Sequence, residues 1–401
     1  MTELSDAHKL IRDTARRVAR EKVAPRAAEL DETGEYPQDI FAAYKDVGLL
    51  GLSIPQEYGG SGAGFLALAL AVEEVAKYCN SSALILLLSA LSTQPINLGG
   101  SEEQKRQWLP RSAAGEIRGA FCLTEPNAGS DAAAIESRAR RDGDPSTGLR
   151  TGDYVIDGEK VYISGGSVAD YVCFFAKTNG DAQTGARPGG TQAISAFVVP
   201  ADSPGFSVAR TDRKMGVIGV PTANIVLQDC RVSAANRLGE EGRAFRTVML
   251  TLNTCRPVVG ARGLGLAEGA IAYALDYARE RKTFGKPLVE HQAIQMMLAE
   301  AAIQIEAARH LVYHAASMVD EGKYDRQHAP YLSIAKTFAT EMCIRVSSDA
   351  IQILGAQGYM KDHPLERHYR DARQLTIVEG TSQIQRLVIA RALVQGDISY
   401  W

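Results

Sequence analysis

The chain of 401 residues lacks closely spaced cysteines. Its six cysteines lie far apart, with no CxxC spacing among them: Cys79, Cys122, Cys173, Cys230, Cys255 and Cys343. A disulfide framework or a zinc site would need thiols at characteristic short spacings, so the pattern argues against both, and no metal is expected. Unpaired thiols favour a reducing compartment, and the sequence therefore predicts a cytoplasmic protein.

An excess of one charge and a long hydrophobic run are also missing. The formal net charge is -3, which gives no basic field to attract nucleic acid. The most apolar stretch, residues 83–91, is far shorter than the roughly 20 residues that cross a bilayer. Residues 10–28 mix arginines with acids and have no cleavage site, which indicates a helix and not a targeting peptide. We expect no nucleic-acid partner and no membrane span.

The chain changes texture twice, which predicts three domains: a helical domain over 1–118, a small β domain over 119–233 and a helical domain over 234–401. The expected strands are 120–123, 154–163, 171–176, 194–199 and 224–227, and the long helices of the last block are 258–281, 294–319 and 334–354. Two connections rich in Gly, Asp and Thr, 141–151 and 179–190, are expected to be surface loops. The fold class is therefore α+β with several domains.

Glu379 is an acid between apolar residues and the start of a predicted helix. Ile377 and Val378 precede it, and Ser382 and Gln385 have the spacing of a capping box. Helix-terminal dipoles favour the anion by about 0.3–1 kcal/mol, whereas burial can raise a carboxyl pKa by about 3–5 units. A carboxyl group with a raised pKa suits a general base. The alternative is an exposed carboxylate that only complements the helix dipole.

Four further polar clusters lie where predicted elements meet. Residues 121–131 run from a strand into a turn whose hydroxyls and N–H groups can hold a planar ring, and residues 162–166 end a strand with Tyr162 and Ser164 on one face. In residues 279–287, at a helix end, Arg281 can make forked contacts to a pyrophosphate. Residues 352–359 can hold adenine or ribose. The alternatives are ordinary surface turns and plain helix caps.

Two features need separate explanations, one in the predicted helix over 258–281 and one in the residues just before it. Gly263, Gly265 and Gly269 resemble a dinucleotide fingerprint, but they follow no predicted strand and lie in a helical pattern, so they are expected to allow close helix packing. Arg256 lies among apolar residues, and a buried arginine needs a partner. It is expected to orient a catalytic acid or to line a pocket.

Taken together, these motifs resemble the acyl-CoA dehydrogenase family over essentially the whole chain, most closely its short- and medium-chain members. The matching segments are LTEPNAGSD at 123–131, KMG at 214–216, RPVV at 256–259, YARERKTFGKPL at 277–288 followed by His291 and Gln292, QILG at 352–355 and EGTSQIQR at 379–386. Each segment alone is a weak signal, but all of them in this order make a specific match.

The resemblance implies an N-terminal all-α domain, a central β-barrel or sandwich-like domain and a C-terminal four-helix bundle, assembled as a homotetramer with FAD. It also implies dehydrogenation of an acyl-CoA thioester to a trans-2-enoyl-CoA in fatty acid metabolism, as in β-oxidation. Glu379 would remove the α-proton while the β-hydrogen passes as hydride to flavin N5. The backbone N–H of Glu379 would help to bind the thioester oxygen. Electron-transfer flavoprotein would accept the electrons.

The resemblance also assigns site residues, motif by motif. The catalytic residue is Glu379. The FAD-binding residues are Phe121, Leu123, Thr124, Gly129, Ser130, Tyr162, Ile163, Ser164, Arg281, Thr283, Phe284, Gln292, Gln352, Gly355, Thr381 and Gln383. The substrate-binding residues are Ser130, Asn253, Arg256 and Gly380. The residues from Arg281 to Gly355 in this set would hold the ADP half of FAD, partly across a subunit interface.

Some positions depart from the family's pattern. Tyr162 replaces the usual tryptophan beside the flavin and Ser164 the usual threonine, which keeps an aromatic ring and a hydroxyl group. Asn253 stands where medium-chain members carry aspartate. Cys255 stands where the isovaleryl- and long-chain branches carry their base, and because cysteine cannot replace that acid, Glu379 is the candidate base.

Three other functions are alternatives: a flavin-dependent monooxygenase, an acyl-CoA oxidase, and a non-catalytic acyl-CoA or acyl-carrier binding module. Glu379 argues against the monooxygenases, which lack an acid at this position, and the intact base and flavin motifs argue against the binding module. Oxidase chains are generally longer. Residues 88–94 are expected to form the floor of the acyl pocket, and their small and medium apolar side chains suit more than one acyl chain.

Overall fold

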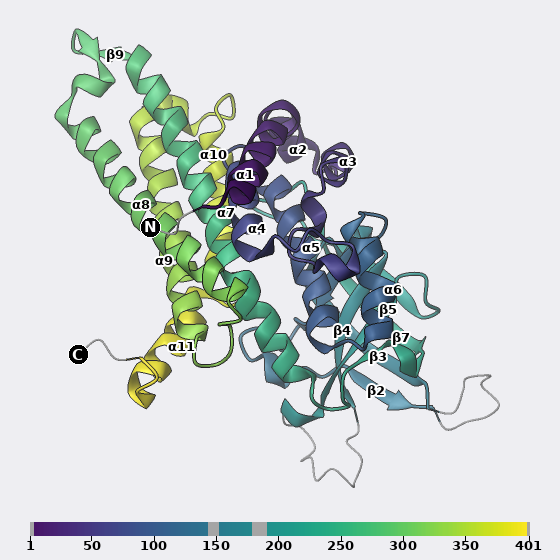
Figure 1. The fold of residues 1–401 in the computed structure, drawn as a ribbon. Helices are drawn as coiled ribbons and strands as arrows, with labels where there is room; N and C mark the ends of the chain where they lie inside the picture. Colours follow the sequence, from purple (N-terminus) through teal and green to yellow (C-terminus); the bar gives the residue numbers. More distant parts are fainter. Residues whose placement is uncertain (1–3, 143–151, 179–190, 399–401) are drawn as a thin grey trace.

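The computed structural model describes residues 4–142, 152–178 and 191–398. It has an N-terminal helical domain, a central sheet domain and a C-terminal helical domain, as the sequence predicts (Figure 1). The sheet lies at one end of the molecule, and the hairpin between the two longest helices lies at the other. Most of the two expected surface loops, residues 143–151 and 179–190, falls outside the described residues.

The N-terminal helices pack around two strongly apolar segments. The α-helices of this part are α1 (Asp6–Val18), α2 (Ala27–Thr33), α3 (Gln38–Asp46), α4 (Gly64–Ala76), α5 (Asn80–Gly99) and α6 (Glu102–Ala113). Helix α4 is buried on nearly every side because apolar residues occupy almost all of its positions. Helix α5 is also mostly buried, although its sequence includes serine, threonine, asparagine and glutamine. Ser101 and Gln104 form a capping box that begins α6.

The central strands form one sheet within the described residues. They are β1 (Gly119–Cys122), β2 (Arg138–Arg141), β3 (Tyr154–Ser164), β4 (Tyr171–Thr178), β5 (Ile194–Pro200), β6 (Phe206–Thr211), β7 (Thr222–Val232) and β8 (Arg237–Leu238). The order is β6-β7-β3-β2-β4-β5-β8, and β1 pairs in parallel with β4. The register of β3 against β7 shifts between Lys160 and Ile163, so the end of β3 leaves the regular sheet geometry.

The C-terminal helices are α7 (Ala244–Glu280), α8 (Gln292–Asp320), α9 (Ala329–Leu354), α10 (Leu365–Leu375) and α11 (Ser382–Gln395). Strands β9 (Lys282–Thr283) and β10 (Lys286–Pro287) form a small hairpin between α7 and α8. Helix α7 packs against α4, α5, α8 and α9. A Cβ atom on Gly265 would lie 2.0 Å from the carbonyl oxygen of Glu73 in α4. The expectation that these glycines allow close helix packing is therefore confirmed.

Helices α5 and α7 are long and apolar enough to cross a membrane by length and composition alone. However, 72% and 67% of their most apolar windows are buried inside the protein, as in the core helices of many soluble proteins. The absence of a membrane span stays a prediction. All six cysteines are buried and unpaired.

Candidate active site

Glu379 lies in the short connection between α10 and α11, in a left-handed backbone conformation with φ 52°. Burial raises the pKa of its carboxyl group to about 7, and the positive charges of Arg262, Lys336 and Arg256 partly oppose this rise. The Oε2 atom is buried and has no hydrogen-bond partner among the described residues. Glu379 is therefore half-buried, with its Oε2 atom shielded from solvent and its pKa raised. Its use as a base stays a prediction.

The predicted capping box at the start of α11 is wrong. The N-cap is Thr381, whose Oγ1 accepts a hydrogen bond from the N–H of Ile384 at 3.2 Å. The side chain of Gln385 instead turns back, and its Nε2 donates to the carbonyl oxygens of Glu379 at 3.1 Å and Gly380 at 3.2 Å. Because the N-cap is Thr381 and not Ser382, Ile384 and not Gln385 occupies the N3 position of a capping box. The amide of Gln385 instead satisfies backbone carbonyl groups before the helix.

Lys336 of α9 makes a further contact to the same segment. Its side chain is fully buried, and Nζ donates to the carbonyl oxygen of Gly380 at 2.9 Å. Burial lowers the pKa of Lys336 to about 8, while the charge of Glu379 opposes the decrease. Sequence reasoning missed Lys336 and gave Gln385 a different role. The one available signal was a lysine on the apolar stripe of the helix over 334–354.

Two buried arginines of α7 complete the positive surroundings of Glu379. Arg256 Nη1 donates to Asn253 Oδ1 at 2.6 Å and to Ser333 Oγ at 3.3 Å, while its Nε has no partner among the described residues. Arg262, which sequence reasoning missed, is 1% exposed and donates to Asn80 and Gln374, each at 3.0 Å. Burial lowers the pKa of both guanidinium groups to about 10, and Glu379 opposes the decrease. Arg256 thus lies within electrostatic range of the predicted base.

The predicted flavin contacts of the β domain gather at the ends of β1 and β3. The backbone N–H of Val161 donates to the carbonyl oxygen of Thr124 at 2.9 Å, which joins the turn after β1 to β3. Tyr162 is 65% exposed, with φ 60°. Of the remaining predicted residues, Gly129 and Ser130 are exposed, Phe121, Thr124 and Ser164 are half-buried, and Leu123 and Ile163 are buried.

A buried ion pair connects the turn that follows β1 to strand β3. Lys160 Nζ donates to Glu125 Oε1 at 2.7 Å, with both side chains almost completely buried. Glu125 also accepts hydrogen bonds from the backbone N–H groups of Glu136 and Ser137, and Lys160 lies 4.9 Å from the centre of the Phe174 ring. Sequence reasoning did not pair these residues, because 35 positions separate them along the chain.

The predicted contacts to the ADP half of FAD lie elsewhere. Arg281, Thr283 and Phe284 belong to the tip between α7 and α8, and Gln292 begins α8. Gln352 and Gly355, at the end of α9, belong to the same end of the helical domain, because one hydrophobic cluster joins the ends of α7, α8 and α9. In Figure 1 this end lies far from the sheet. One chain therefore does not bring the two halves of the predicted FAD set together.

Unusual backbone conformations mark both halves of this set. Five non-glycine residues of the described ranges have a positive φ: Tyr162, Val217, Asp229, Phe284 and Glu379. Three of them are predicted site residues, and such conformations cost about 1–2 kcal/mol per residue. Tyr162 is largely exposed and Phe284 is 98% exposed, so both rings are free to cover a bound planar group. These exposed rings and the neighbouring hydroxyls fit FAD.

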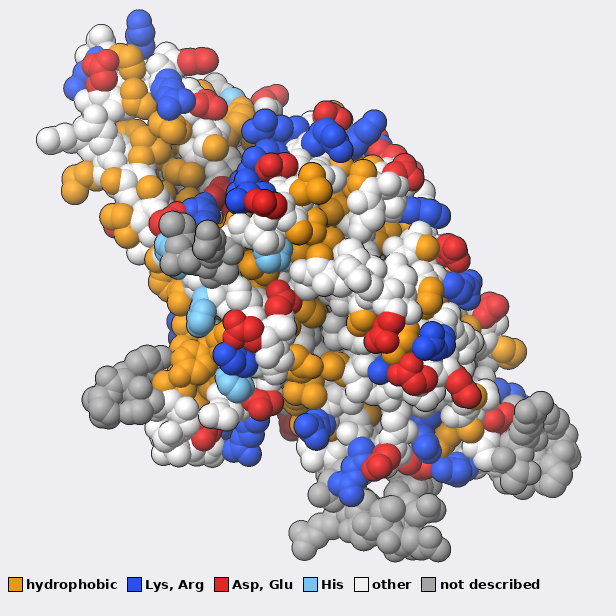
Figure 2. All heavy atoms as spheres, in the orientation of Figure 1, with side chains coloured by type: hydrophobic (Ala, Val, Ile, Leu, Met, Phe, Trp, Pro, Cys, Tyr) orange, Lys and Arg blue, Asp and Glu red, His pale blue; other side chains and the backbone are white. Residues whose placement is uncertain are grey.

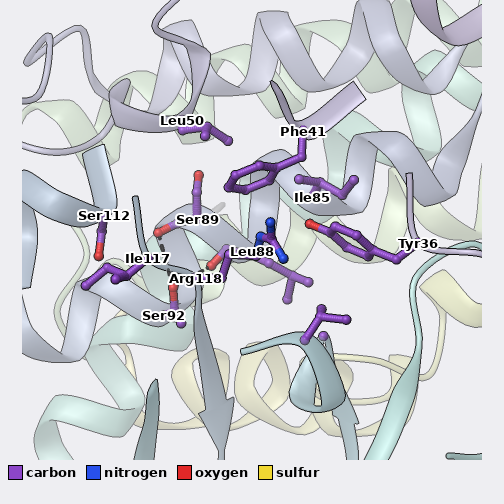
Figure 3. A pocket seen from close by; sticks show the side chains of 13 residues that line it. Tyr36, Phe41, Leu50, Ile85, Leu88, Ser89, Ser92, Ser112, Ile117 and Arg118 are labelled. Atoms are coloured by element: carbon purple, nitrogen blue, oxygen red, sulfur yellow. Dashed lines mark hydrogen bonds between the residues drawn. The ribbon is translucent and has the colours of Figure 1, made fainter. Parts of the chain in front are cut away.

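A cavity of about 40 Å³, which has room for about three water molecules, lies between the N-terminal helices and the sheet (Figure 3). Leu88, Ser89 and Ser92 of the predicted acyl-pocket floor line it. Figure 3 shows the guanidinium group of Arg118 beside them, and this group lies 4.4 Å from the centre of the Phe41 ring. Glu379 does not line this cavity, so it is not the space beside the predicted base.

Comparisons with known proteins agree along the whole chain. Models of the N-terminal, middle and C-terminal domains of acyl-CoA dehydrogenases match residues 5–116, 120–230 and 242–394. Cyclohexane-1-carbonyl-CoA dehydrogenase from Geobacter metallireducens is 41% identical, over 98% of this chain and 99% of the relative. Butyryl-CoA dehydrogenase from Megasphaera elsdenii has a TM-score of 0.91 at 37% identity, covering 98% of this chain and 100% of that chain.

A further match is a chain from structural work on the electron transferring flavoprotein of Acidaminococcus fermentans, with a TM-score of 0.91 at 38% identity. It covers 98% of this chain and 100% of that chain. Three domain models that together span most of the sequence, and relatives near 40% identity over the full length, settle the family. The chain belongs to the acyl-CoA dehydrogenase family of FAD-dependent oxidoreductases.

Proposed function

We propose that the protein converts an acyl-CoA thioester to a trans-2-enoyl-CoA, with Glu379 as the base that removes the α-proton. The observation that supports this most strongly is the state of Glu379 itself. Its Oε2 is buried and has no hydrogen-bond partner in the described part of the chain, and burial raises the pKa of the carboxyl group to about 7. A base with a pKa near the operating pH is substantially ionised and still accepts a proton readily.

The chain's own groups account for the proton half of the reaction. The ionised carboxylate of Glu379 accepts the α-proton as the α C–H bond breaks, and the electron pair of that bond forms the new double bond as the β-hydrogen leaves as hydride. Bound FAD supplies the acceptor for that hydride. The backbone N–H of Glu379 has no acceptor among the described residues, so it can donate to the thioester oxygen, where negative charge develops.

Residues at both ends of the molecule would hold FAD. Thr124, Ser130, Tyr162 and Ser164 would contact the flavin half, together with Thr381 and Gln383 at the start of α11. The exposed set at the tip of α7 and α8 would hold the ADP half of a neighbouring subunit's cofactor, since the tip lies far from the sheet of its own chain (Figure 1). Asn253, Arg256 and Gly380 would meet the CoA thioester.

We propose two protein partners, further copies of this chain and an electron acceptor. Exposed hydrophobic side chains on the C-terminal helices, including Met296, Ile303 and Val394, favour self-association, and we propose a homotetramer. Figure 2 shows hydrophobic side chains gathered over the end that holds the tip of α7 and α8. The similarity to a chain studied with an electron transferring flavoprotein supports such a protein as the electron acceptor. A reducing cytoplasm suits the unpaired cysteines.

An anaerobic titration tests the proposal. The purified protein is mixed with butyryl-, isobutyryl-, octanoyl- or palmitoyl-CoA while the visible flavin absorbance is followed. Bleaching by one of them is the expected result and also identifies the chain-length class. Glu379→Gln should keep bound FAD and lose bleaching, whereas the exposed Glu321→Gln should behave as wild type. Undiminished bleaching in Glu379→Gln would sink the assignment of the base, and a protein that cannot take up FAD would overturn the function.

A further inference from the structure

Two buried side chains hold the backbone on both sides of Gly380. Gln385 Nε2 donates to the carbonyl oxygens of Glu379 and Gly380, and Lys336 Nζ donates to that of Gly380 at 2.9 Å. These two carbonyls belong to consecutive peptide groups. Both donors have 0% exposed side chains, so water does not compete for the hydrogen bonds and their geometry is restrained from two helices, α9 and α11.

The restrained segment has a conformation that it would not keep alone. Glu379 has φ 52° and Gly380 φ 93°. A non-glycine residue in the left-handed region is disfavoured, so surrounding contacts must hold it there. A Cβ atom on Gly380 would lie 2.5 Å from Gln385 Nε2, which shows how closely the amide covers this backbone. Both carbonyls are thus occupied, whereas the N–H of Glu379 has no acceptor within the residues that the structure describes.

Charge adds a second effect of Lys336. The groups that face Glu379 are Arg256 and Arg262 of α7, together with the neutral thiol of Cys255, and Lys336 of α9; Asp371 of α10 acts on Arg262. Arg256 and Arg262 have side-chain hydrogen-bond partners of their own. Lys336 is the cation in this group that also contacts the backbone of the base segment.

We propose that Lys336 and Gln385 are positioning residues for the reaction. Gln385 and Lys336 hold the two carbonyls so that the N–H and the carboxyl group of Glu379 face the same substrate. The charge of Lys336, together with those of Arg262 and Arg256, favours the ionised form of Glu379 near neutral pH. This inference rests on the proposed function, in which Glu379 is the base. If Lys336 served only to pack the interior, it would affect neither the position nor the ionisation of Glu379.

Three variants separate position from charge. Lys336→Gln keeps an N–H donor but removes the charge, Gln385→Leu removes the amide donors without changing any charge, and Lys336→Met removes both donor and charge. Thr337→Val is the matched control in α9, because the buried Oγ1 of Thr337 has no partner among the described residues. The rate constant of flavin reduction by the best substrate is measured from pH 5.5 to 9, with FAD content and substrate KM determined in parallel.

The proposal predicts a different profile for each variant. In Lys336→Gln the inflection of the rate against pH should move upward by about one unit, because an opposite charge nearby favours the ionised carboxylate. This shift corresponds to about a fivefold lower rate at pH 7 and an unchanged plateau at high pH. Gln385→Leu should keep the inflection and lower the plateau. Lys336→Met should show both effects, and Thr337→Val neither.

A measurement without substrate provides an independent readout. Between pH 5 and 7.5 the unfolding midpoint of Lys336→Gln should fall more steeply with pH than that of the wild type, and this difference should disappear when both carry Glu379→Gln. Wild-type inflections and plateaus in all three variants would overturn the inference. Loss of flavin reduction in Lys336→Met with an unshifted inflection in Lys336→Gln would overturn the charge effect. Full reduction in Glu379→Gln alone would instead overturn the proposed base, so the two failures are distinguishable.

Discussion

The backbone N–H of Val217 donates to Oδ1 of Asp371, which ties the loop between β6 and β7 to α10. Val217 has φ 52°, and its carbonyl oxygen accepts a hydrogen bond from Lys214 Nζ at 2.6 Å. Asp371 is 2% exposed, and burial raises its pKa to about 6, with the N–H of Val217 opposing the rise. A buried carboxylate thus holds a strained loop in the sheet domain against the C-terminal helices.

This relationship predicts a pH-dependent stability. The folded state raises the pKa of Asp371 from 3.8 to about 6 and so binds the proton more tightly than the unfolded state. The free energy of unfolding should therefore decrease as pH rises from about 4 to 6, by up to about 3 kcal/mol from this group. Asp371→Asn should lack this decrease in urea unfolding measured across that range. Equal slopes in Asp371→Asn and the exposed control Asp202→Asn would contradict the assignment.

The exposed ring of Tyr162 predicts a selective effect on cofactor binding. Aromatic stacking contributes about 0.5–1.5 kcal/mol beyond burial of area, so Tyr162→Ala should weaken FAD binding by about two- to tenfold. Tyr162→Phe keeps the ring and should bind FAD as the wild type does. Titration of the apoprotein with FAD, followed by flavin fluorescence, measures the difference. Val208→Ala, a control on the exposed face of β6, should have no effect, and an equal loss in this control would remove the specific role of the ring.

The buried ion pair of Lys160 and Glu125, beside the turn that follows β1, predicts a large effect on stability. Removing one member of a buried pair leaves the other charge uncompensated and typically destabilises by about 3–5 kcal/mol. Lys160→Met should therefore reduce the free energy of urea unfolding by that amount and reduce FAD occupancy. The double variant Lys160→Met with Glu125→Gln should recover part of the loss, because no unpaired charge remains. A double variant less stable than Lys160→Met would show that the charge is not the cause.

Hydrophobic periodicity predicted the helices and strands whose sequences carry a clear apolar pattern. The expected strands over 154–163 and 171–176 correspond to β3 and β4, and the long helices correspond to α7, α8 and α9. Strands β2 and β6 were missed because β2 is Arg-Ala-Arg-Arg and nearly every side chain of β6 is exposed. Sheet pairing and not local hydrophobicity determines such strands. Family motifs identified Glu379, Arg256 and the turn over 123–131 as candidate site residues.

The partners of those motif residues could not be predicted in the same way. Lys336 and Gly380 are 44 positions apart, and Arg262 and Asn80 are 182 apart. A lysine or arginine in an apolar helix indicates that a partner exists, but the sequence does not say which group the packing of α7, α9 and α11 brings to it. The role of Gln385 could not be predicted either. Its spacing in the sequence predicted a helix cap, whereas in the folded chain its amide donates to the carbonyl oxygen of Glu379.

Glu379 should make the protein less stable as its carboxyl group becomes ionised. Burial raises the pKa of Glu379 from 4.5 to about 7, so the folded state binds this proton more tightly than the unfolded state, and the free energy of unfolding falls as pH rises through this range. The fall is at most about 3 kcal/mol, and less to the extent that water reaches the half-buried carboxyl group. Glu379→Gln should therefore match the wild type near pH 4.5 and exceed its stability at pH 8, as measured by urea unfolding at both values. A variant that is inactive and yet no more stable at pH 8 would mean that the carboxylate is better solvated than its buried Oε2 indicates, and that its basicity has another source.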